Sequence, residues 1–91
     1  MIDGGAKVLE EKHMISTLLF LSGNDGCSKS ELYRAVSTNP RMPEKLDILE
    51  RAGLIRQDSN DGSRAVNIRL TDLGNAVSAK LAEIDSLMSR Q

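Results

Sequence analysis

The segment from Leu46 to Gly74 constrains the fold of this chain more strongly than any other part of the sequence. It begins with apolar residues at helical spacing and then reaches Gly53, a residue type that often follows the last turn of a helix. Two short runs with strand character come next, and the polar residues 59–63 join them as the tip of a hairpin. Thr71 is a typical cap for a following helix. We therefore predict that this segment folds as helix, hairpin and helix.

Turn residues and helix caps divide the rest of the chain. Ser28, followed three residues later by Glu31, has the spacing of a capping box. Asn39 before Pro40 is typical of an N-cap and a first helical residue, although Pro43 leaves open a later start at Met42. With these boundaries we predict helices over residues 6–22, 29–36, 40–52 and 72–90 and strands over residues 54–58 and 64–70.

These elements predict a mainly helical protein with a small β-hairpin, of the α+β class. The 91 residues are enough for one small domain. We expect a frayed N-terminus over residues 1–5, a core unit over residues 6–70 and a C-terminal helix over residues 71–91.

Composition limits the function classes. The chain has 12 Lys and Arg against 13 Asp and Glu, a net charge of -1, which argues against a dedicated non-specific nucleic-acid binder. One cysteine cannot form an internal disulfide, so the chain fits a reducing cytoplasm. No apolar run approaches the length of a membrane span, and Met1–Gly5 lacks the features of a signal peptide.

The sequence carries no residue set with catalytic or metal-binding spacing. His13 lies in a predicted helix, without an acid and a nucleophile at a supporting spacing. No His/Cys pattern matches a metal site, and Cys27 is interpreted as a small buried hydrophobe. We therefore expect neither an enzyme nor a cofactor.

The last predicted helix has an apolar stripe along its whole length of about 28 Å. Either this stripe pairs with a second copy of the chain, which we favour, or its first half packs on the first helix and the rest frays. The dimer contact would use Leu73, Val77, Leu81, Ile84, Leu87 and Met88. Leu9 and Phe20 lie off the apolar face of the first helix, where they either pack against a neighbouring loop or contact another subunit.

These residues resemble the winged-helix transcription regulators of the MarR and PadR type. The family typically shows L-x-x-L-E-x-x-G-L-I, a wing with D-x-R, and L-T-x-x-G. The matching residues are Leu46-Asp47-Ile48-Leu49-Glu50, Gly53-Leu54-Ile55, Arg64-Ala65-Val66, Leu70-Thr71 and Gly74. Two features depart from the family. Gly62 stands at the wing aspartate position, with the acid one step earlier at Asp61, and the long flanking helices that build the MarR ligand pocket are missing.

The resemblance implies a helix-turn-helix whose third helix enters the major groove of DNA while the wing lies on the backbone or in the minor groove. Met42, Leu46 and Leu49 would point inward. The expected outward residues of the third helix are Arg41, Glu44, Lys45 and Ile48. The expected phosphate contacts are Lys29, Arg34, Arg56, Arg64 and Arg69.

The resemblance therefore implies a cytoplasmic, homodimeric regulator that binds double-stranded DNA in a sequence-specific manner. Two alternatives remain open: a winged helix that assembles with other proteins of a transcription or chromatin complex, and an architectural chromatin protein. The acids Glu44, Asp47 and Glu50 on the third helix favour the protein-binding alternative, whereas the absence of a basic excess weighs against the chromatin protein.

Overall fold

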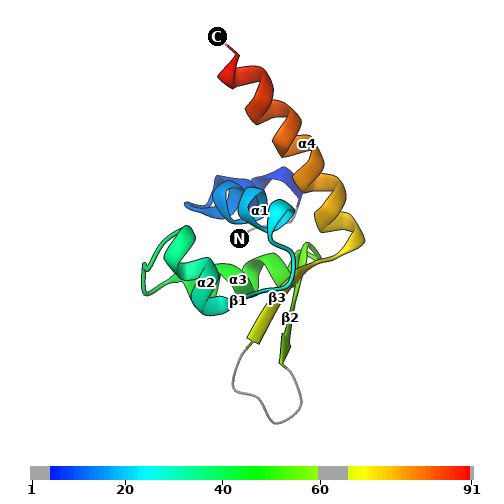
Figure 1. Cartoon of the computed structure of the whole chain (residues 1–91). Coiled ribbons are helices and arrows are strands. Elements are labelled where there is room, and N and C mark those ends of the chain that lie inside the picture. The colour runs from blue at the N-terminus through cyan, green and yellow to red at the C-terminus, as the bar shows by residue number, and fades with distance from the viewer. Residues whose placement is uncertain (1–4, 60–65, 91) are drawn as a thin grey trace.

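The computed structural model describes residues 5–59 and 66–90 of the chain, which form a group of helices with a small sheet beside it (Figure 1). A short 3-10 helix η1 comes first, and a long helix α4 that extends away from the other elements ends the chain (Figure 1). The elements are η1 (Gly5–Glu10), α1 (Met14–Gly23), β1 (Cys27–Ser28), α2 (Lys29–Ala35), α3 (Met42–Arg51), β2 (Ile55–Ser59), β3 (Val66–Leu70) and α4 (Asp72–Ser89).

The prediction of a single helix over residues 6–22 is wrong, because the helical structure is interrupted between η1 and α1. His13 at the break has a φ of 71°, which no α-helix contains. In a continuous helix, Val8 and Met14 would lie about 120° apart around the axis. The break lets both be buried, at 2% and 0% exposure. Gly5, predicted to be frayed, belongs to η1, whereas residues 1–4 lie outside the described residues.

The capping box before α2 is confirmed. The Ser28 amide donates to Glu31 Oε1 at 2.9 Å, and the Glu31 amide donates to Ser28 Oγ at 3.1 Å. Hydrogen bonding to the Glu31 carboxylate, from the Ser28 backbone amide first and from the Ser28 side chain second, favours the charged form and lowers the pKa of Glu31. The predicted end of this helix at Val36 is one residue too long.

Helix α3 starts at Met42, the later of the two starts that Pro43 leaves open. The predicted N-cap role of Asn39 is wrong. Its Oδ1 accepts a hydrogen bond from the Arg41 amide at 2.8 Å, which closes a turn before the helix, and Arg41 is the capping residue.

The sheet has three antiparallel strands in the order β1-β3-β2, so the predicted hairpin is extended by one strand. Sequence analysis missed β1, because two residues carry no readable periodicity. The ladder pairs Ile55 with Leu70 and Arg56 with Arg69. The predicted hairpin tip falls mostly on residues 60–63, which lie outside the described residues.

The G-L-I and L-T-x-x-G motifs contact each other directly. Thr71 donates from its amide to the Leu54 carbonyl at 3.1 Å and from its hydroxyl to the Gly53 carbonyl. The same hydroxyl accepts from the Gly74 amide at 3.0 Å, which confirms Thr71 as the cap of α4. Gly74 lies so close to Leu54 that a Cβ atom would overlap the Leu54 carbonyl oxygen. The two motifs therefore fix α4 against the end of α3.

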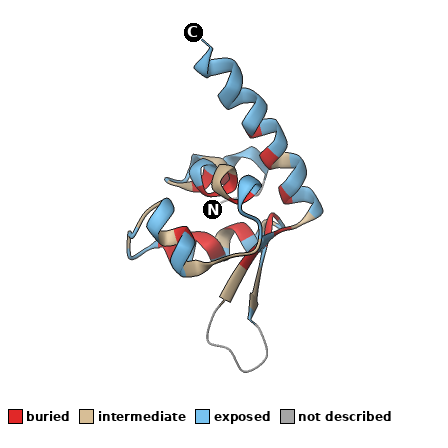
Figure 2. Ribbon diagram, viewed as in Figure 1, coloured by how far each residue is buried: buried red, intermediate tan, exposed pale blue. Residues whose placement is uncertain are grey.

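The hydrophobic core lies where α1, α2, α3 and the sheet meet, and the far half of α4 projects from it (Figure 2). Residues 82–90 are all exposed. The fully buried apolar residues include Leu18, Leu21, Leu32, Leu46, Leu49 and Ile68.

Candidate nucleic-acid interface

Helix α3 presents a polar surface on the side opposite to its buried residues. Met42, Leu46 and Leu49 are at most 1% exposed and face the core, as predicted. Glu44 and Arg51 are seven residues apart, which places them on the same exposed side of the helix. The exposed polar residues of α3 and its cap are Arg41, Glu44, Asp47, Glu50 and Arg51.

Lys45 corrects the predicted interface, because it does not point outward. It is 9% exposed, and its Nζ lies 3.4 Å from Glu11 Oε1 in the segment that joins η1 to α1. The break at His13 places Glu11 beside α3, where its carboxylate compensates the desolvation of the ammonium group. Ile48 was also expected outward, but it is half-buried and packs against the core.

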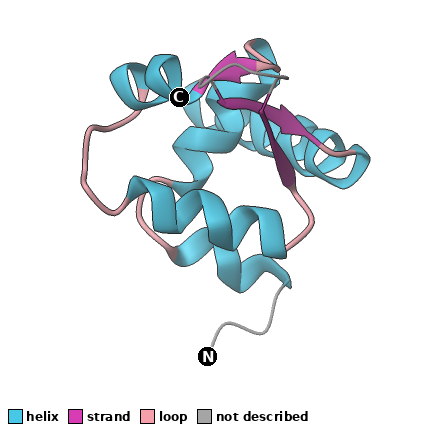
Figure 3. Ribbon diagram, turned by 90° about the horizontal axis from the view of Figure 1, so that it is seen from below, coloured by secondary structure: helices cyan, strands magenta, loops and turns pink. Residues whose placement is uncertain are grey.

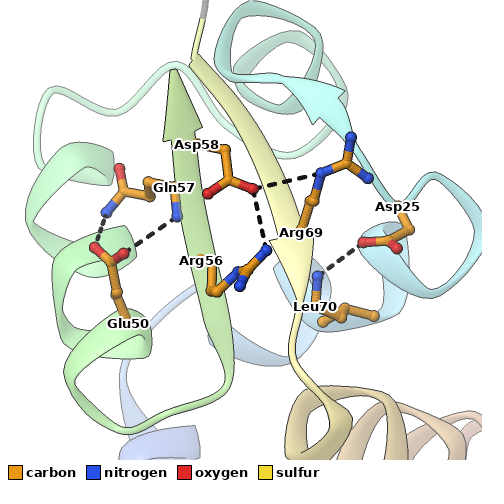
Figure 4. A network of polar contacts seen from close by, with 7 residues as sticks. All are labelled: Asp25, Glu50, Arg56, Gln57, Asp58, Arg69 and Leu70. Carbon is orange, nitrogen blue, oxygen red and sulfur yellow. Dashed lines mark hydrogen bonds and ion pairs between the residues drawn. The ribbon is translucent and has the colours of Figure 1, made fainter. Parts of the chain in front are cut away.

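Gln57 on β2 holds two carboxylates of α3. Its amide nitrogen Nε2 donates to Asp47 Oδ1 at 3.0 Å and to Glu50 Oε1 at 2.9 Å. Its backbone amide also donates to Glu50 Oε2 at 3.2 Å (Figure 4). These contacts fix the sheet relative to α3 and orient part of its acidic edge toward the sheet. Sequence analysis missed Gln57, since its partners lie on a different element.

Two predicted phosphate contacts, Arg56 and Arg69, come together on the sheet. They lie opposite each other in the β2–β3 ladder, and Asp58 Oδ2 is 3.5 Å from Arg56 Nη2 and 3.5 Å from Arg69 Nε (Figure 4). All three side chains keep at least 40% of their surface exposed. The strands that carry them form one small sheet beside the helices (Figure 3).

The remaining predicted basic residues are dispersed. Lys29 and Arg34 lie near opposite ends of α2, and Arg41 lies at the start of α3. Arg64, together with its predicted pairing to Asp61, lies outside the described residues. The structure therefore places Arg56 and Arg69 side by side, whereas Lys29, Arg34 and Arg41 lie apart from one another.

Sequence analysis did not single out two further residues near the polar face of α3, Tyr33 and Arg51. Burial and then the charge of Asp47 raise the pKa of Tyr33, so the face of α2 that carries Tyr33 lies near α3. Arg51 could have been found from its helical spacing to Glu44.

The predicted dimer residues fall into two groups. Leu73, Ile84, Leu87 and Met88 are between 50% and 70% exposed. Val77 and Leu81 pack against the core, and so do Leu9 and Phe20, which were expected as a second contact face. For Phe20 the structure therefore agrees with the alternative of packing within its own chain.

A groove of about 490 Å³ runs between η1 and α4. Its wall includes Leu9, Leu54, Leu73, Val77, Leu81 and Ile84, with Lys80 at the same surface. The groove therefore continues the exposed apolar stripe of α4 toward the core.

No group of three metal-ligating side chains is found among residues 5–59 and 66–90. None of the helices described is both long enough and apolar enough to cross a bilayer. Burial and then the charge of Glu31 raise the pKa of Cys27, which disfavours a reactive thiolate.

Solved structures of transcription regulators are similar to this chain. MepR, a transcription regulator of the Staphylococcus aureus multidrug efflux pump MepA, is 27% identical with a TM-score of 0.74, over 87% of this chain and 60% of MepR. A transcriptional regulator homologue from Pyrococcus horikoshii OT3 is 16% identical with a TM-score of 0.75, over 92% of this chain and 87% of that chain. Reduced AbfR bound to DNA is 22% identical with a TM-score of 0.65, over 86% of this chain and 58% of AbfR.

These likenesses confirm the predicted winged helix-turn-helix fold and the predicted resemblance to regulators of the MarR type. The match spans 60% of the length of MepR. No protein-family model matches the chain, and no curated protein sequence matches it either.

Proposed function

We propose that this chain is a sequence-specific, DNA-binding transcription regulator, with α3 in the major groove and the β2–β3 wing on the DNA backbone. The observation that carries the proposal is the arrangement of an exposed polar face on α3 beside a sheet with two adjacent arginines. The likeness to MepR, and to AbfR in its complex with DNA, supports the same function.

Each part of the site has a distinct task in this proposal. Arg41 and Arg51 reach guanine edges or phosphates from the two ends of α3. Glu44, on the exposed face between them, accepts a hydrogen bond from cytosine. Lys29, Arg34, Arg56 and Arg69 neutralise phosphates. Lys45 is not part of this set, because its ammonium is engaged by Glu11.

The binding experiment is a salt series on labelled duplexes. We expect affinity to fall steeply with salt, and Arg41→Ala to make the salt slope shallower by about one unit. Lys7→Ala is the matched control, since it removes the same charge from η1. Absent or salt-independent binding would contradict the proposal.

A protein-binding winged helix is the second candidate. The orientation of Asp47 and Glu50 by Gln57 favours it, because a fixed acidic edge repels phosphates. A chain that fails to bind duplexes but is folded would support this alternative.

The proposed regulator acts in the cytoplasm, in keeping with its single cysteine, and it is a homodimer joined through α4. The partner's α4 runs antiparallel and covers the groove beside η1. The exposed apolar side chains of α4, which are Leu73, Ile84, Leu87 and Met88, supply the contact between the two copies. Two third helices about 34 Å apart would then read a pseudo-palindromic site.

Sedimentation equilibrium tests the dimer. Leu87→Glu should give a monomer without loss of fold, because Leu87 is 63% exposed in the single chain. Ser86→Glu is the control, since nine residues separate it from Val77 and place it on the far side of α4. A monomeric wild-type chain, or a dimeric Leu87→Glu variant, would contradict the α4 pairing.

A further inference from the structure

The outer face of the sheet brings two like charges together at a position where they would repel. Arg56 and Arg69 are direct partners in the antiparallel ladder, and like charges directly opposite each other destabilise a sheet. Asp58 lies two residues along β2, on the same face as Arg56. Its Oδ2 is 3.5 Å from Arg56 Nη2 and 3.5 Å from Arg69 Nε, so one carboxylate oxygen serves both arginines (Figure 4).

The guanidinium of Arg69 is also confined by the loop before β1. A Cβ atom at Gly26 would lie only 3.2 Å from Arg69 Nη1, so the guanidinium rests against bare backbone. That backbone is held in turn, since the Gly26 amide donates to the Ile68 carbonyl at 2.8 Å. The next residue back, Asp25, accepts from the Leu70 amide at 2.8 Å through its Oδ1 (Figure 4). Arg69 therefore has a defined position, with Asp58 on one side and Gly26 on the other.

We propose that Arg56 and Arg69 form one binding site for a single phosphate of the DNA backbone, and that Asp58 occupies this site as an internal competing anion until DNA binds. This inference rests on the proposed function. It assigns to Asp58 the regulation of phosphate binding by the wing. One carboxylate offsets only one of the two positive charges, so the cluster keeps a net attraction for a phosphate.

The chemistry of the three side chains suits an exchange of anions. Guanidinium groups bind carboxylates and phosphates with the same donor geometry, so a phosphate can replace the carboxylate. Asp58 keeps 40% of its side-chain surface exposed and can rotate into water when it is displaced. The Arg56 and Arg69 side chains are 65% and 48% exposed, so an external anion can reach them.

The neighbouring helix makes a DNA phosphate the fitting anion. Strand β2 packs beside α3, and Gln57 ties the two elements through Asp47 and Glu50. A duplex seated on α3 would therefore bring the backbone that flanks the groove to the adjacent sheet. On DNA that α3 does not fit, the Asp58 carboxylate would still compete with the phosphate for Arg56 and Arg69. This competition would lower the affinity for non-specific DNA.

The test compares Asp58→Asn in two backgrounds, on random-sequence duplexes about 25 base pairs long, enough for two half-sites one turn apart. In the wild-type background, Asp58→Asn should raise affinity about two- to fivefold, the range for releasing an exposed ion pair. It should also steepen the salt slope by about one unit. In the Arg56→Ala/Arg69→Ala background, the same change should have no more effect than Glu10→Gln, which removes an equal charge from η1.

The outcomes separate this inference from the proposed function. An unchanged or weaker affinity of Asp58→Asn overturns the inference, since Asp58 would then support DNA binding or be irrelevant to it. A gain that persists without the two arginines also overturns it, because the effect would be one of net charge alone. If the wild-type chain shows no salt-dependent binding, the proposed function fails first and the inference falls with it. Urea unfolding of each variant confirms that the fold is intact.

Discussion

Lys45 and Glu11, 34 residues apart in the sequence, form an ion pair that joins the segment between η1 and α1 to α3. The Lys45 side chain is 11% exposed and that of Glu11 is 42% exposed, so the pair lies at the margin of the core. The helix that fits the major groove in the proposed function is therefore anchored by one of its own basic residues, which leaves one fewer cation for DNA.

Lys45→Met tests this assignment. The thioether replaces the buried aliphatic stem, so the free energy of unfolding should change by no more than about 1 kcal/mol. Affinity for duplex DNA should stay within about twofold of wild type, the change expected when no phosphate contact is lost. Urea unfolding and fluorescence anisotropy measure the two effects, with Arg41→Ala as the comparison that should lose affinity. A loss in Lys45→Met as large as in Arg41→Ala would restore Lys45 to the interface.

Gln57→Glu tests the link between the sheet and α3. It places a third carboxylate beside Asp47 and Glu50, where Gln57 now donates two hydrogen bonds. We expect a loss of about 0.5–1 kcal/mol in the free energy of unfolding at low ionic strength, smaller at high salt because the repulsion is screened. Gln57→Met is the control, since it removes the same hydrogen bonds without adding charge and its effect should not depend on salt. Equal salt dependence of the two variants would show that the carboxylates are not close in solution.

Gly74→Ala tests the contact between the two sequence motifs. The added methyl group would overlap the Leu54 carbonyl oxygen, a backbone atom that cannot move aside easily. We expect the variant to lose at least about 2 kcal/mol of unfolding free energy, as an overpacked site does. Gly23→Ala is the control, because nothing lies within 4 Å of its added methyl group. It should change stability by less than about 1 kcal/mol, in the stabilising direction. Similar urea midpoints for both variants would contradict the close contact.

Glu31→Gln tests the pH dependence of the capping box. Hydrogen bonding from the Ser28 backbone, and then from the Ser28 side chain, lowers the pKa of Glu31 in the folded chain from its ordinary value of 4.5. A carboxyl group with a depressed folded pKa stabilises the fold above its unfolded pKa, and this stabilisation is lost as the pH falls through the folded value. The stability difference between wild type and Glu31→Gln should therefore be constant above pH 4.5 and shrink below it. Urea midpoints across the acid range measure it, with Glu10→Gln outside the capping box as control. A difference that is independent of pH would contradict the capping interaction.

Local patterns predicted most of the secondary structure. The capping box at Ser28, the cap at Thr71 and the helix end at Gly53 depend on residues within one turn of each other, so they can be read directly. The motifs around Leu54 and Gly74 likewise predicted the fold class, because each has one dominant local geometry. The failures have a common cause. The break at His13 and the two-residue β1 arise from contacts with distant parts of the chain, namely α3 and β3.

For the candidate site too, local sequence patterns predicted some features and contacts between distant residues decided the others. The sequence by itself determined which residues lie on α3 and on the wing strands, since helical and strand periodicity are local properties. Only the tertiary structure decided which of these charges remain available to a partner. Glu11 engages Lys45, Gln57 holds Asp47 and Glu50, and Asp58 lies between Arg56 and Arg69. The physical reason is that a charge acts over a few ångströms in space, and chain folding alone sets which opposite charge comes within that distance.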